Sequence, residues 1–166
     1  FDTDTEILKI AAKKFAKNEN VTVKQESSQL TIGGYDAVVS SNVLMLMKTR
    51  EELGRVVEHM KSLVASGGSI YVGITHPCFL DHKFATYSND FTDGHKVFDY
   101  FKNGADYNVY MTVGSVEIEI KDHFWNLSTI INEFLVSDLC LRSIVELPDI
   151  QSSNFSPFLF MKFCRE

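Results

Sequence analysis

The segment that decides the fold reads Tyr35-Asp36-Ala37-Val38-Val39-Ser40-Ser41-Asn42-Val43-Leu44. It follows a turn at Gly33-Gly34 and contains an apolar, β-branched run of the kind found in strands buried on both faces of a parallel sheet. The polar residues from Ser40 to Asn42 lie where such a strand would end. In open α/β sheets, ligands bind outside the carboxyl ends of the strands. The segment therefore predicts a buried parallel strand with a binding site at its tip.

The bulk composition indicates a globular domain with an acidic surface. The chain has 166 residues, of which 45% are hydrophobic and 23% charged, so it is long enough to bury one sizeable core. A net charge of -6 leaves no basic footprint for nucleic acid and disfavours docking on anionic lipid. The sequence has no run of 18 apolar residues, and we expect no signal peptide. We therefore expect neither a membrane span nor a nucleic-acid partner.

The three cysteines, Cys78, Cys140 and Cys164, are widely spaced and odd in number. This pattern argues against a disulfide framework or a cysteine zinc site, and it fits a reducing compartment. We expect a cytoplasmic protein with no metal site. Because the chain starts at Phe1, on what reads as the end of a strand, we also expect further sequence upstream.

Two capping-box motifs predict the starts of helices. Thr3-Asp4-Thr5-Glu6 has the required spacing directly after Phe1-Asp2, and apolar residues follow it at helical spacing. Thr49-Arg50-Glu51-Glu52 repeats the motif before a second amphipathic segment. We expect this second helix to end at Gly67-Gly68, because glycine tolerates the left-handed conformation needed just past a helix C-terminus.

Strands are expected between and after these helices. Residues 21–25 alternate and are rich in β-branched side chains, and residues 69–75 are apolar nearly throughout. The resulting order is β-α-β-β-α-β with short turns. This order predicts an α/β fold with a mostly parallel sheet and helices on both faces.

The chain changes character after residue 75. Residues 76–106 are rich in aromatic and polar side chains without a clear period, which is typical of a lid or binding insert. We see no linker, so we predict one domain over residues 1–166, with an aromatic insert at about 76–122. The later elements that we expect are two hairpin strands, a helix and two closing strands, at 107–111, 116–120, 124–135, 139–147 and 158–163.

This succession resembles class I S-adenosylmethionine-dependent methyltransferases of the type that act on small molecules. The resemblance spans nearly the whole chain and is best at residues 1–16, 35–44 and 63–75. It implies a Rossmann-like fold with an antiparallel final strand, and S-adenosyl-L-methionine as cofactor. The glycine-rich loop of this family would lie upstream of Phe1, so we expect the N-terminal strand-helix unit to be missing from this chain.

The resemblance also implies a cofactor site. Asp2 matches the acidic residue that accepts hydrogen bonds from ribose hydroxyls, although a charged residue at a strand end needs no ligand. At the adenine position the family's usual acidic residue is replaced by Ser27, with Glu26 one residue earlier. The polar strand tip has helix-entry capping as its alternative role. The implied cofactor-binding set is Asp2, Thr3, Ser27, Ser28, Ser41, Asn42 and Val43.

The acceptor side is expected after the strand at residues 69–75. His76 follows that strand directly and is a candidate general base, because the pKa of histidine lies near neutrality. Alternatively, His76 satisfies loop backbone groups. Phe79, His123 and Trp125 are candidates for substrate contacts. The aromatic insert as a whole either lines an acceptor pocket or forms a second small core.

The predicted function is methyl transfer from S-adenosylmethionine to a small-molecule acceptor. The chain lacks an Asn/Asp-Pro-Pro-Tyr/Phe segment after residues 35–41, which argues against methylation of nucleic-acid amino groups. One alternative is a non-catalytic, methyltransferase-like binding module. Another is a different nucleotide-binding α/β enzyme, such as a nicotinamide-dependent reductase. A homodimer is left open.

Overall fold

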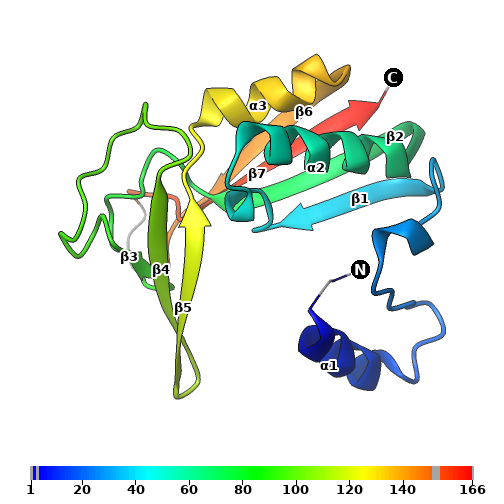
Figure 1. Cartoon of the computed structure of the whole chain (residues 1–166), viewed down its shortest axis with the longest axis horizontal. Helices are drawn as coiled ribbons and strands as arrows, with labels where there is room; N and C mark the ends of the chain where they lie inside the picture. The colour runs from blue at the N-terminus through cyan, green and yellow to red at the C-terminus, as the bar shows by residue number, and fades with distance from the viewer. Residues whose placement is uncertain (1, 3, 151–153, 166) are drawn as a thin grey trace.

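A computed structural model describes residue 2, residues 4–150 and residues 154–165 of the chain (Figure 1). The helices are α1 (Thr5–Phe15), the short 3₁₀ helices η1 (Ser27–Gln29) and η2 (Leu44–Leu46), α2 (Arg50–Leu63) and α3 (Leu127–Val136). The strands are β1 (Tyr35–Ser41), β2 (Val64–Thr75), β3 (Ser88–Asn89), β4 (Asp106–Val113), β5 (Val116–His123), β6 (Leu139–Leu147) and β7 (Phe158–Arg165).

The larger sheet holds four strands in the order β1-β2-β7-β6. β1 and β2 run parallel, with Val38 paired to Ile70 and Ser41 to Gly73, whereas β7 is antiparallel to both of its neighbours. Helices α2 and α3 lie together on one face of this sheet, the upper face in Figure 1. The predicted α/β class is confirmed, with the antiparallel final strand in place, and the described strands form a mixed sheet.

A hydrophobic core fills the space between this sheet and helices α2 and α3. The rings of Phe134 on α3 and Phe163 on β7 stack with their centroids 4.1 Å apart, and both side chains are fully buried. Each large apolar side chain buried here contributes about 1.5–3 kcal/mol to folding. The other core residues are mostly aliphatic and include Leu53, Val57, Met60, Ile70, Val72 and Ile74.

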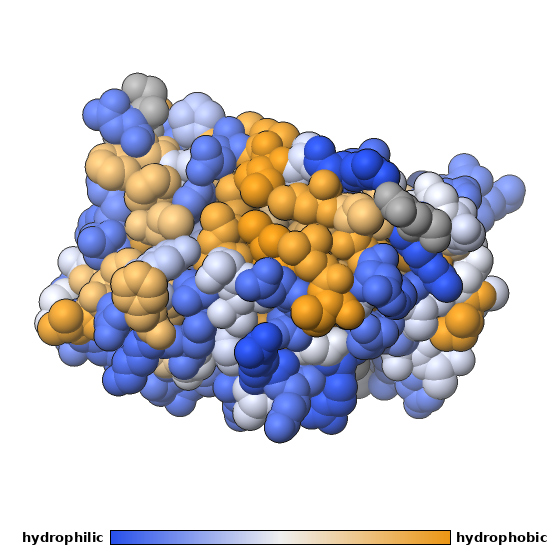
Figure 2. Space-filling model, turned by 90° about the horizontal axis from the view of Figure 1, so that it is seen from above, coloured by the Kyte–Doolittle hydropathy of each residue, from blue (hydrophilic) through white to orange (hydrophobic). Residues whose placement is uncertain are grey.

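The outer side of α3 keeps apolar side chains in contact with solvent. Figure 2 looks down on the side of the molecule where α2 and α3 lie, and it shows apolar atoms gathered over the middle of that face. Leu135 is 45% exposed and Val136 is also exposed. These positions therefore contribute little to the core and serve as controls for buried positions on the same helix.

A smaller, three-stranded sheet forms from β3, β4 and β5. It stands to one side of the larger sheet in Figure 1. The predicted hairpin at residues 107–120 is confirmed, since β4 and β5 pair from Asp106 with His123 to Val113 with Val116. The side chains buried against it form a second, mainly aromatic core: Leu80, Phe84, Tyr87, Tyr107, Val109 and Phe124. Of the two alternatives for the aromatic insert, the structure shows the second core.

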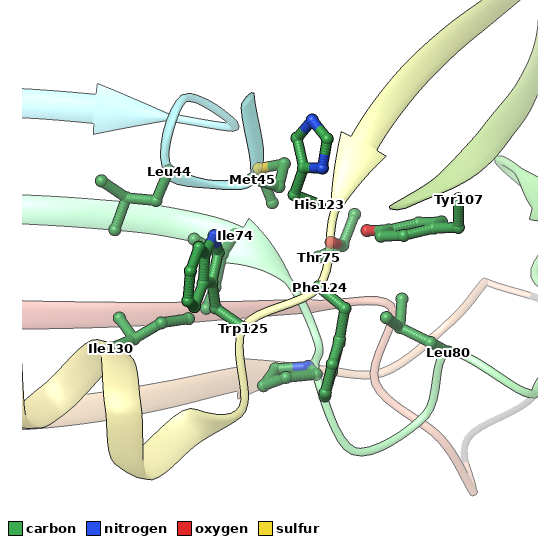
Figure 3. A pocket seen from close by; sticks show the side chains of 11 residues that line it. Leu44, Met45, Ile74, Thr75, Leu80, Tyr107, His123, Phe124, Trp125 and Ile130 are labelled. Carbon is green, nitrogen blue, oxygen red and sulfur yellow. The ribbon is translucent and has the colours of Figure 1, made fainter. Parts of the chain in front are cut away.

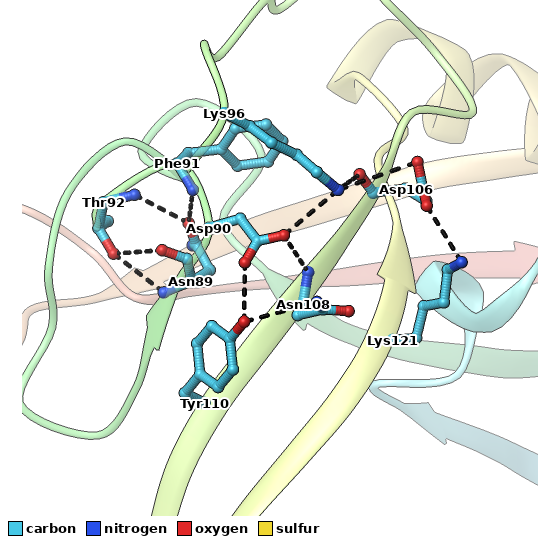
Figure 4. A network of polar contacts seen from close by, with 9 residues as sticks. All are labelled: Asn89, Asp90, Phe91, Thr92, Lys96, Asp106, Asn108, Tyr110 and Lys121. Carbon is cyan, nitrogen blue, oxygen red and sulfur yellow. Dashed lines mark hydrogen bonds and ion pairs between the residues drawn. The ribbon is translucent and has the colours of Figure 1, made fainter. Parts of the chain in front are cut away.

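A polar network ties the loop after β3 to the neighbouring strands (Figure 4). The buried carboxylate of Asp90 accepts hydrogen bonds from the Tyr110 hydroxyl at 2.9 Å and from the Asn108 amide at 3.2 Å. Lys96 Nζ lies 3.2 Å from the same carboxylate. Burial raises the pKa of the Asp90 carboxyl, but these three partners outweigh burial and hold the pKa below its usual range.

The N-terminal region differs from the prediction in two respects. Asp4, rather than Thr3, caps α1, because its Oδ1 accepts the Glu6 and Ile7 amides at 2.8 and 3.2 Å. Thr3 lies outside the described residues, as does Phe1. The predicted strand at residues 21–25 is wrong: there the described chain has one backbone link to Asp2, from its amide to the Lys24 carbonyl at 3.3 Å, and a strand needs a ladder of such bonds.

The capping box at Thr49 is confirmed, but the predicted end of the second helix is wrong. Thr49 Oγ1 accepts the Glu52 amide at 3.2 Å, and Glu52 Oε2 accepts the Thr49 amide at 3.2 Å. The helix ends at Leu63, and Gly67, with φ +74°, lies within β2 instead.

A Cβ at Gly68 would lie 2.9 Å from the Asp36 carbonyl oxygen, so this glycine allows β1 to approach β2 closely.

Candidate functional site

The tips of β1 and β2 lie side by side because the two strands are parallel neighbours. Ser40 pairs with Val72 and Ser41 with Gly73, so both strands end at the same edge of the sheet. The next residue, Asn42, turns the chain with φ +53°, and its amide donates to the Gly73 carbonyl at 2.8 Å. Asparagine is one of the few residues that tolerate this left-handed conformation. The tips of β1 and β2 therefore converge at one edge of the sheet.

A groove with a cavity volume of about 700 Å³ runs along the free side of β1. It brings Asp2 together with Ser41 and Val43, which are three of the seven predicted cofactor-binding residues. Its remaining walls are mainly apolar and come from β1, η2 and α2, including Val38, Leu46, Met47, Val56 and Met60. The groove therefore combines an apolar lining with a few polar groups.

One of the two carboxylate oxygens of Asp2 accepts a hydrogen bond. Its Oδ1 accepts the Asp4 amide at 2.9 Å, and within the described part of the chain no donor contacts Oδ2. The side chain is neither fully buried nor fully exposed. An oxygen in this position can accept hydrogen bonds from vicinal hydroxyls.

The other predicted cofactor-binding residues do not line this groove. Ser27 and Ser28 are exposed on η1, where Ser28 Oγ donates to Glu26 Oε2 at 3.1 Å. Asn42 lies between two lining residues in the chain but turns at the strand tip. Thr3 lies outside the described residues. The structure therefore assembles part of the predicted set.

His76, the predicted catalytic residue, is 3% exposed, and both of its ring nitrogens have partners. Nε2 lies 2.6 Å from Glu146 Oε1 on β6, and Nδ1 accepts the Cys78 amide at 3.2 Å. The contact with Glu146 joins the end of β2 to the edge strand β6, and the bond from Cys78 is local to the loop after β2. The geometry matches the alternative in which the histidine satisfies its surroundings. Phe79 packs beside it, with ring centroids 4.5 Å apart, at the margin of the aromatic core.

His123 and Trp125 meet at a second, much smaller cavity of about 10 Å³ (Figure 3). Met45, from the loop after β1, and Thr75, at the end of β2, line the same cavity. Trp125 Nε1 donates to the Met47 carbonyl at 2.9 Å, so the indole joins the start of α3 to the β1 loop. The space is close to what one water molecule needs.

His123 is 7% exposed, and its imidazole makes no hydrogen bond or ion pair with the residues that the structure describes. Burial lowers the pKa of this imidazole, because the charged form loses its hydration. The lowered pKa favours the neutral form of this ring, which has no hydrogen-bond partner among the described residues. His123 and Trp125 are the two predicted substrate residues that the structure brings to the strand tips.

Two buried ionisable groups near this cavity were missed at the level of sequence. Tyr107 shares a side-chain hydrogen bond with Thr75, and burial raises the pKa of its phenol. Asp122, its cross-strand partner, is 5% exposed, and burial raises the pKa of its carboxyl to about 6. The alternating pattern of β5 gave no warning, because Asp122 lies in a run that reads as a solvated strand end.

Within residues 2, 4–150 and 154–165, no group of three or more histidine, cysteine, aspartate or glutamate side chains is placed to hold a metal ion. No helix in the same described part of the chain is long and apolar enough to cross a bilayer.

Comparison with known proteins gives a clear answer for the fold. No family model matches the chain, and no curated protein matches its sequence. Among solved structures, an S-adenosylmethionine-dependent methyltransferase from Clostridium acetobutylicum superposes with a TM-score of 0.67 at 13% identity, covering 98% of this chain and 72% of that one. A putative methyltransferase of the same kind from Listeria monocytogenes gives 0.67 at 15% identity, covering 99% and 77%.

A third neighbour holds a ligand. The N-methyltransferase NodS from Bradyrhizobium japonicum, solved with S-adenosyl-L-homocysteine, gives a TM-score of 0.60 at 13% identity, covering 98% of this chain and 63% of that one. The chain therefore has the fold of class I S-adenosylmethionine-dependent methyltransferases, and the predicted resemblance is confirmed at the level of the fold.

Proposed function

We propose that the protein transfers a methyl group from S-adenosylmethionine to a small-molecule acceptor. The observation that carries this proposal is the groove beside β1, which gathers Asp2, Ser41 and Val43 at one strand tip. It coincides with a fold shared with methyltransferases.

The donor set of the groove fits an adenosyl group. Asp2 offers a carboxylate oxygen with no partner in the described chain, which suits two ribose hydroxyls. Val43, Leu46 and Met47 offer apolar surface for a flat base. When bound, the cofactor would supply a methyl group on a positively charged sulfur. The residues of the chain would then act by aligning the two reactants and excluding water.

The acceptor side of the proposal rests on the junction of the two sheets. His123, Trp125 and Thr75 gather there beside the β1 loop. The net charge of -6 disfavours a polyanionic acceptor, since nucleic-acid binding depends on neutralising phosphates with basic side chains. A small, uncharged or cationic acceptor fits this environment better.

Calorimetric titration with S-adenosylmethionine tests the proposal directly. We expect the protein to bind it and Asp2→Asn to weaken binding at least tenfold, because the amide accepts hydrogen bonds less strongly than a carboxylate. Asp36→Asn is the matched control: it removes the same charge from β1, at a residue that does not line the groove.

The two alternative functions, a non-catalytic binding module and a nicotinamide-dependent reductase, predict different results in this titration. A non-catalytic module binds no S-adenosylmethionine, and this result would overturn the proposal. A nicotinamide-dependent reductase binds NADH in preference to S-adenosylmethionine.

The homodimer and the cytoplasmic location also stay predictions. Light scattering tests the homodimer, and fractionation of cells tests the location.

A further inference from the structure

Two histidines, His76 and His123, lie near the tips of β1 and β2 and differ in the hydrogen bonding of their ring nitrogens. Both nitrogens of His76 are engaged, by Glu146 and by the Cys78 amide. Neither nitrogen of His123 has a hydrogen-bond partner in the part of the chain that is described. We propose that His123, not His76, is the catalytic base that removes the proton of the methyl acceptor. This role rests on the proposed function.

The position of His123 supports this role. It is the last residue of β5, and the strand packs against η2, the turn that directly follows the β1 tip. Figure 3 shows its ring beside Met45, on the side of the cavity where the β1 loop lies, with Thr75 of β2 close to it. The imidazole therefore stands where the ends of three strands meet, beside Met45, whose chain neighbour Leu46 lines the groove with Ser41 and Val43.

The charges around His123 nearly balance. Asp106 faces it from β4, and Lys121 lies two residues before it on β5. Lys48, just before α2, and Glu52, in the first turn of α2, also act on it electrostatically. Two of these groups favour the protonated ring and two disfavour it. Burial then decides the outcome and lowers the pKa of the imidazole. A neutral ring keeps a lone pair free to accept a proton at neutral pH.

In the proposed reaction, His123 accepts one proton from the methyl acceptor. The acceptor heteroatom bonds to the methyl carbon, and the carbon–sulfur bond breaks with its electron pair remaining on sulfur. The heteroatom then carries one proton too many, and this proton passes to a ring nitrogen of His123. From the imidazolium it leaves to solvent after the products dissociate. No redox partner is required.

A histidine titration by NMR tests the state of the ring without cofactor or acceptor. The chain has five histidines, and His123→Gln identifies the resonances of His123 by their loss. We expect these resonances to titrate below pH 6.5, with the nitrogen shifts of a neutral ring at pH 7. Ring protons of His123 that exchange slowly at pH 7 would show bonded nitrogens and would overturn the proposal.

Turnover supplies the second test. The probes are radiolabelled S-adenosylmethionine with a panel of simple phenols and amines (catechol, 4-nitrophenol, benzylamine). With an acceptor that the wild type methylates, we expect His123→Gln to lower kcat about 100-fold or more while KM changes less than threefold. Exogenous imidazole should restore part of the activity of His123→Ala. His95→Gln removes an imidazole from an exposed loop position and is the matched control.

The outcomes separate this role from the proposed function. Failure of the wild type to bind S-adenosylmethionine would overturn the proposed function and this role with it. Binding and turnover that His123→Gln leaves within threefold of wild type would overturn the role of His123 alone. An unchanged affinity of His123→Gln for S-adenosylmethionine shows that the variant folds.

Discussion

The two sheets of the molecule have different interiors and contribute differently to the site. The larger sheet packs aliphatic side chains and one stacked pair of phenylalanines against two helices, and its strands end in polar tips. The smaller sheet packs against an aromatic core, and several ionisable side chains are buried in this region, among them Asp90, Asp122 and Tyr107. The difference indicates that the larger sheet mainly stabilises and positions the site. In the smaller sheet, burial raises the pKa of Asp122 and Tyr107, whereas hydrogen-bond partners lower the pKa of Asp90.

The largest expected effect comes from the core of the larger sheet. Phe134→Ala removes a fully buried ring that stacks on Phe163, so we expect a loss of about 3–5 kcal/mol in the free energy of unfolding. Urea denaturation followed by circular dichroism measures it. Leu135→Ala, at a neighbouring exposed position, should cost less than about 1 kcal/mol. Equal losses for the two variants would show that this core does not dominate stability.

The polar network of the smaller sheet gives the next effect. Asp90→Ala leaves the Tyr110 hydroxyl, the Asn108 amide and Lys96 without their shared acceptor, and we expect a loss of about 2 kcal/mol. The folded-state pKa of Asp90 is depressed, so the stability it contributes is present above the unfolded pKa and is lost as pH falls through the folded pKa.

Hydrogen exchange localises the Asp90 effect. Protection should fall in β3 and β4 and stay unchanged in β1 and β2, because the network links the loop after β3 to β4. Asp93→Ala, at an exposed position in the same loop, should leave protection as it is. Loss of protection throughout the larger sheet would mean that the two sheets unfold as one unit.

Asp122 should show the opposite dependence on pH. Its folded-state pKa is raised to about 6, above the unfolded value of about 3.9, so its ionisation destabilises the fold as pH rises through this window. We expect Asp122→Asn to stabilise the protein at pH 8 by about 1–2 kcal/mol, after allowance for solvent screening, and to have little effect at pH 4. Thermal unfolding at both pH values checks this; a gain of equal size at pH 4 would contradict it.

The smallest effect concerns the entry to α2. Thr49→Ala removes the acceptor of the Glu52 amide, and we expect a loss of about 1 kcal/mol. Thr49→Ser keeps the hydroxyl and should recover most of that stability. A loss as large as that of Phe134→Ala would point to a further role of Thr49.

Local patterns in the sequence sufficed for the elements whose stability is local or whose side chains alternate. The runs at Tyr35–Ser41 and Leu139–Leu147 both predicted strands that the structure confirms. The predicted burial of the first strand on both faces is wrong, because β1 lies at the edge of the described sheet and Val39 is 73% exposed. The Thr49 capping box did the same for α2, because its partners lie three residues apart. Residues 21–25 have equal β-propensity, yet strand formation depends on a pairing partner and not on propensity alone.

Part of the candidate site could be predicted from the sequence, since three of the seven predicted cofactor-binding residues line the groove, but the bonding state of its histidines could not. The sequence places His76 and His123 near strand ends, and nothing local tells which ring is bonded. His76 meets Glu146, 70 residues away, through the pairing of β6 with β7 and of β7 with β2. The burial of Asp122 likewise depends on how the hairpin stands against the larger sheet. Contacts between distant segments decide these properties.

The central claim is that the β1 groove of the larger sheet, and not the smaller sheet, holds the adenosyl group. NMR chemical-shift mapping with S-adenosyl-L-homocysteine tests it most directly. We predict the largest amide shifts at Ser41, Val43 and Asn42, which forms the turn between them, with the second core unchanged. Shifts confined to the β3-β4-β5 sheet, or no shifts at saturating ligand, would contradict the account.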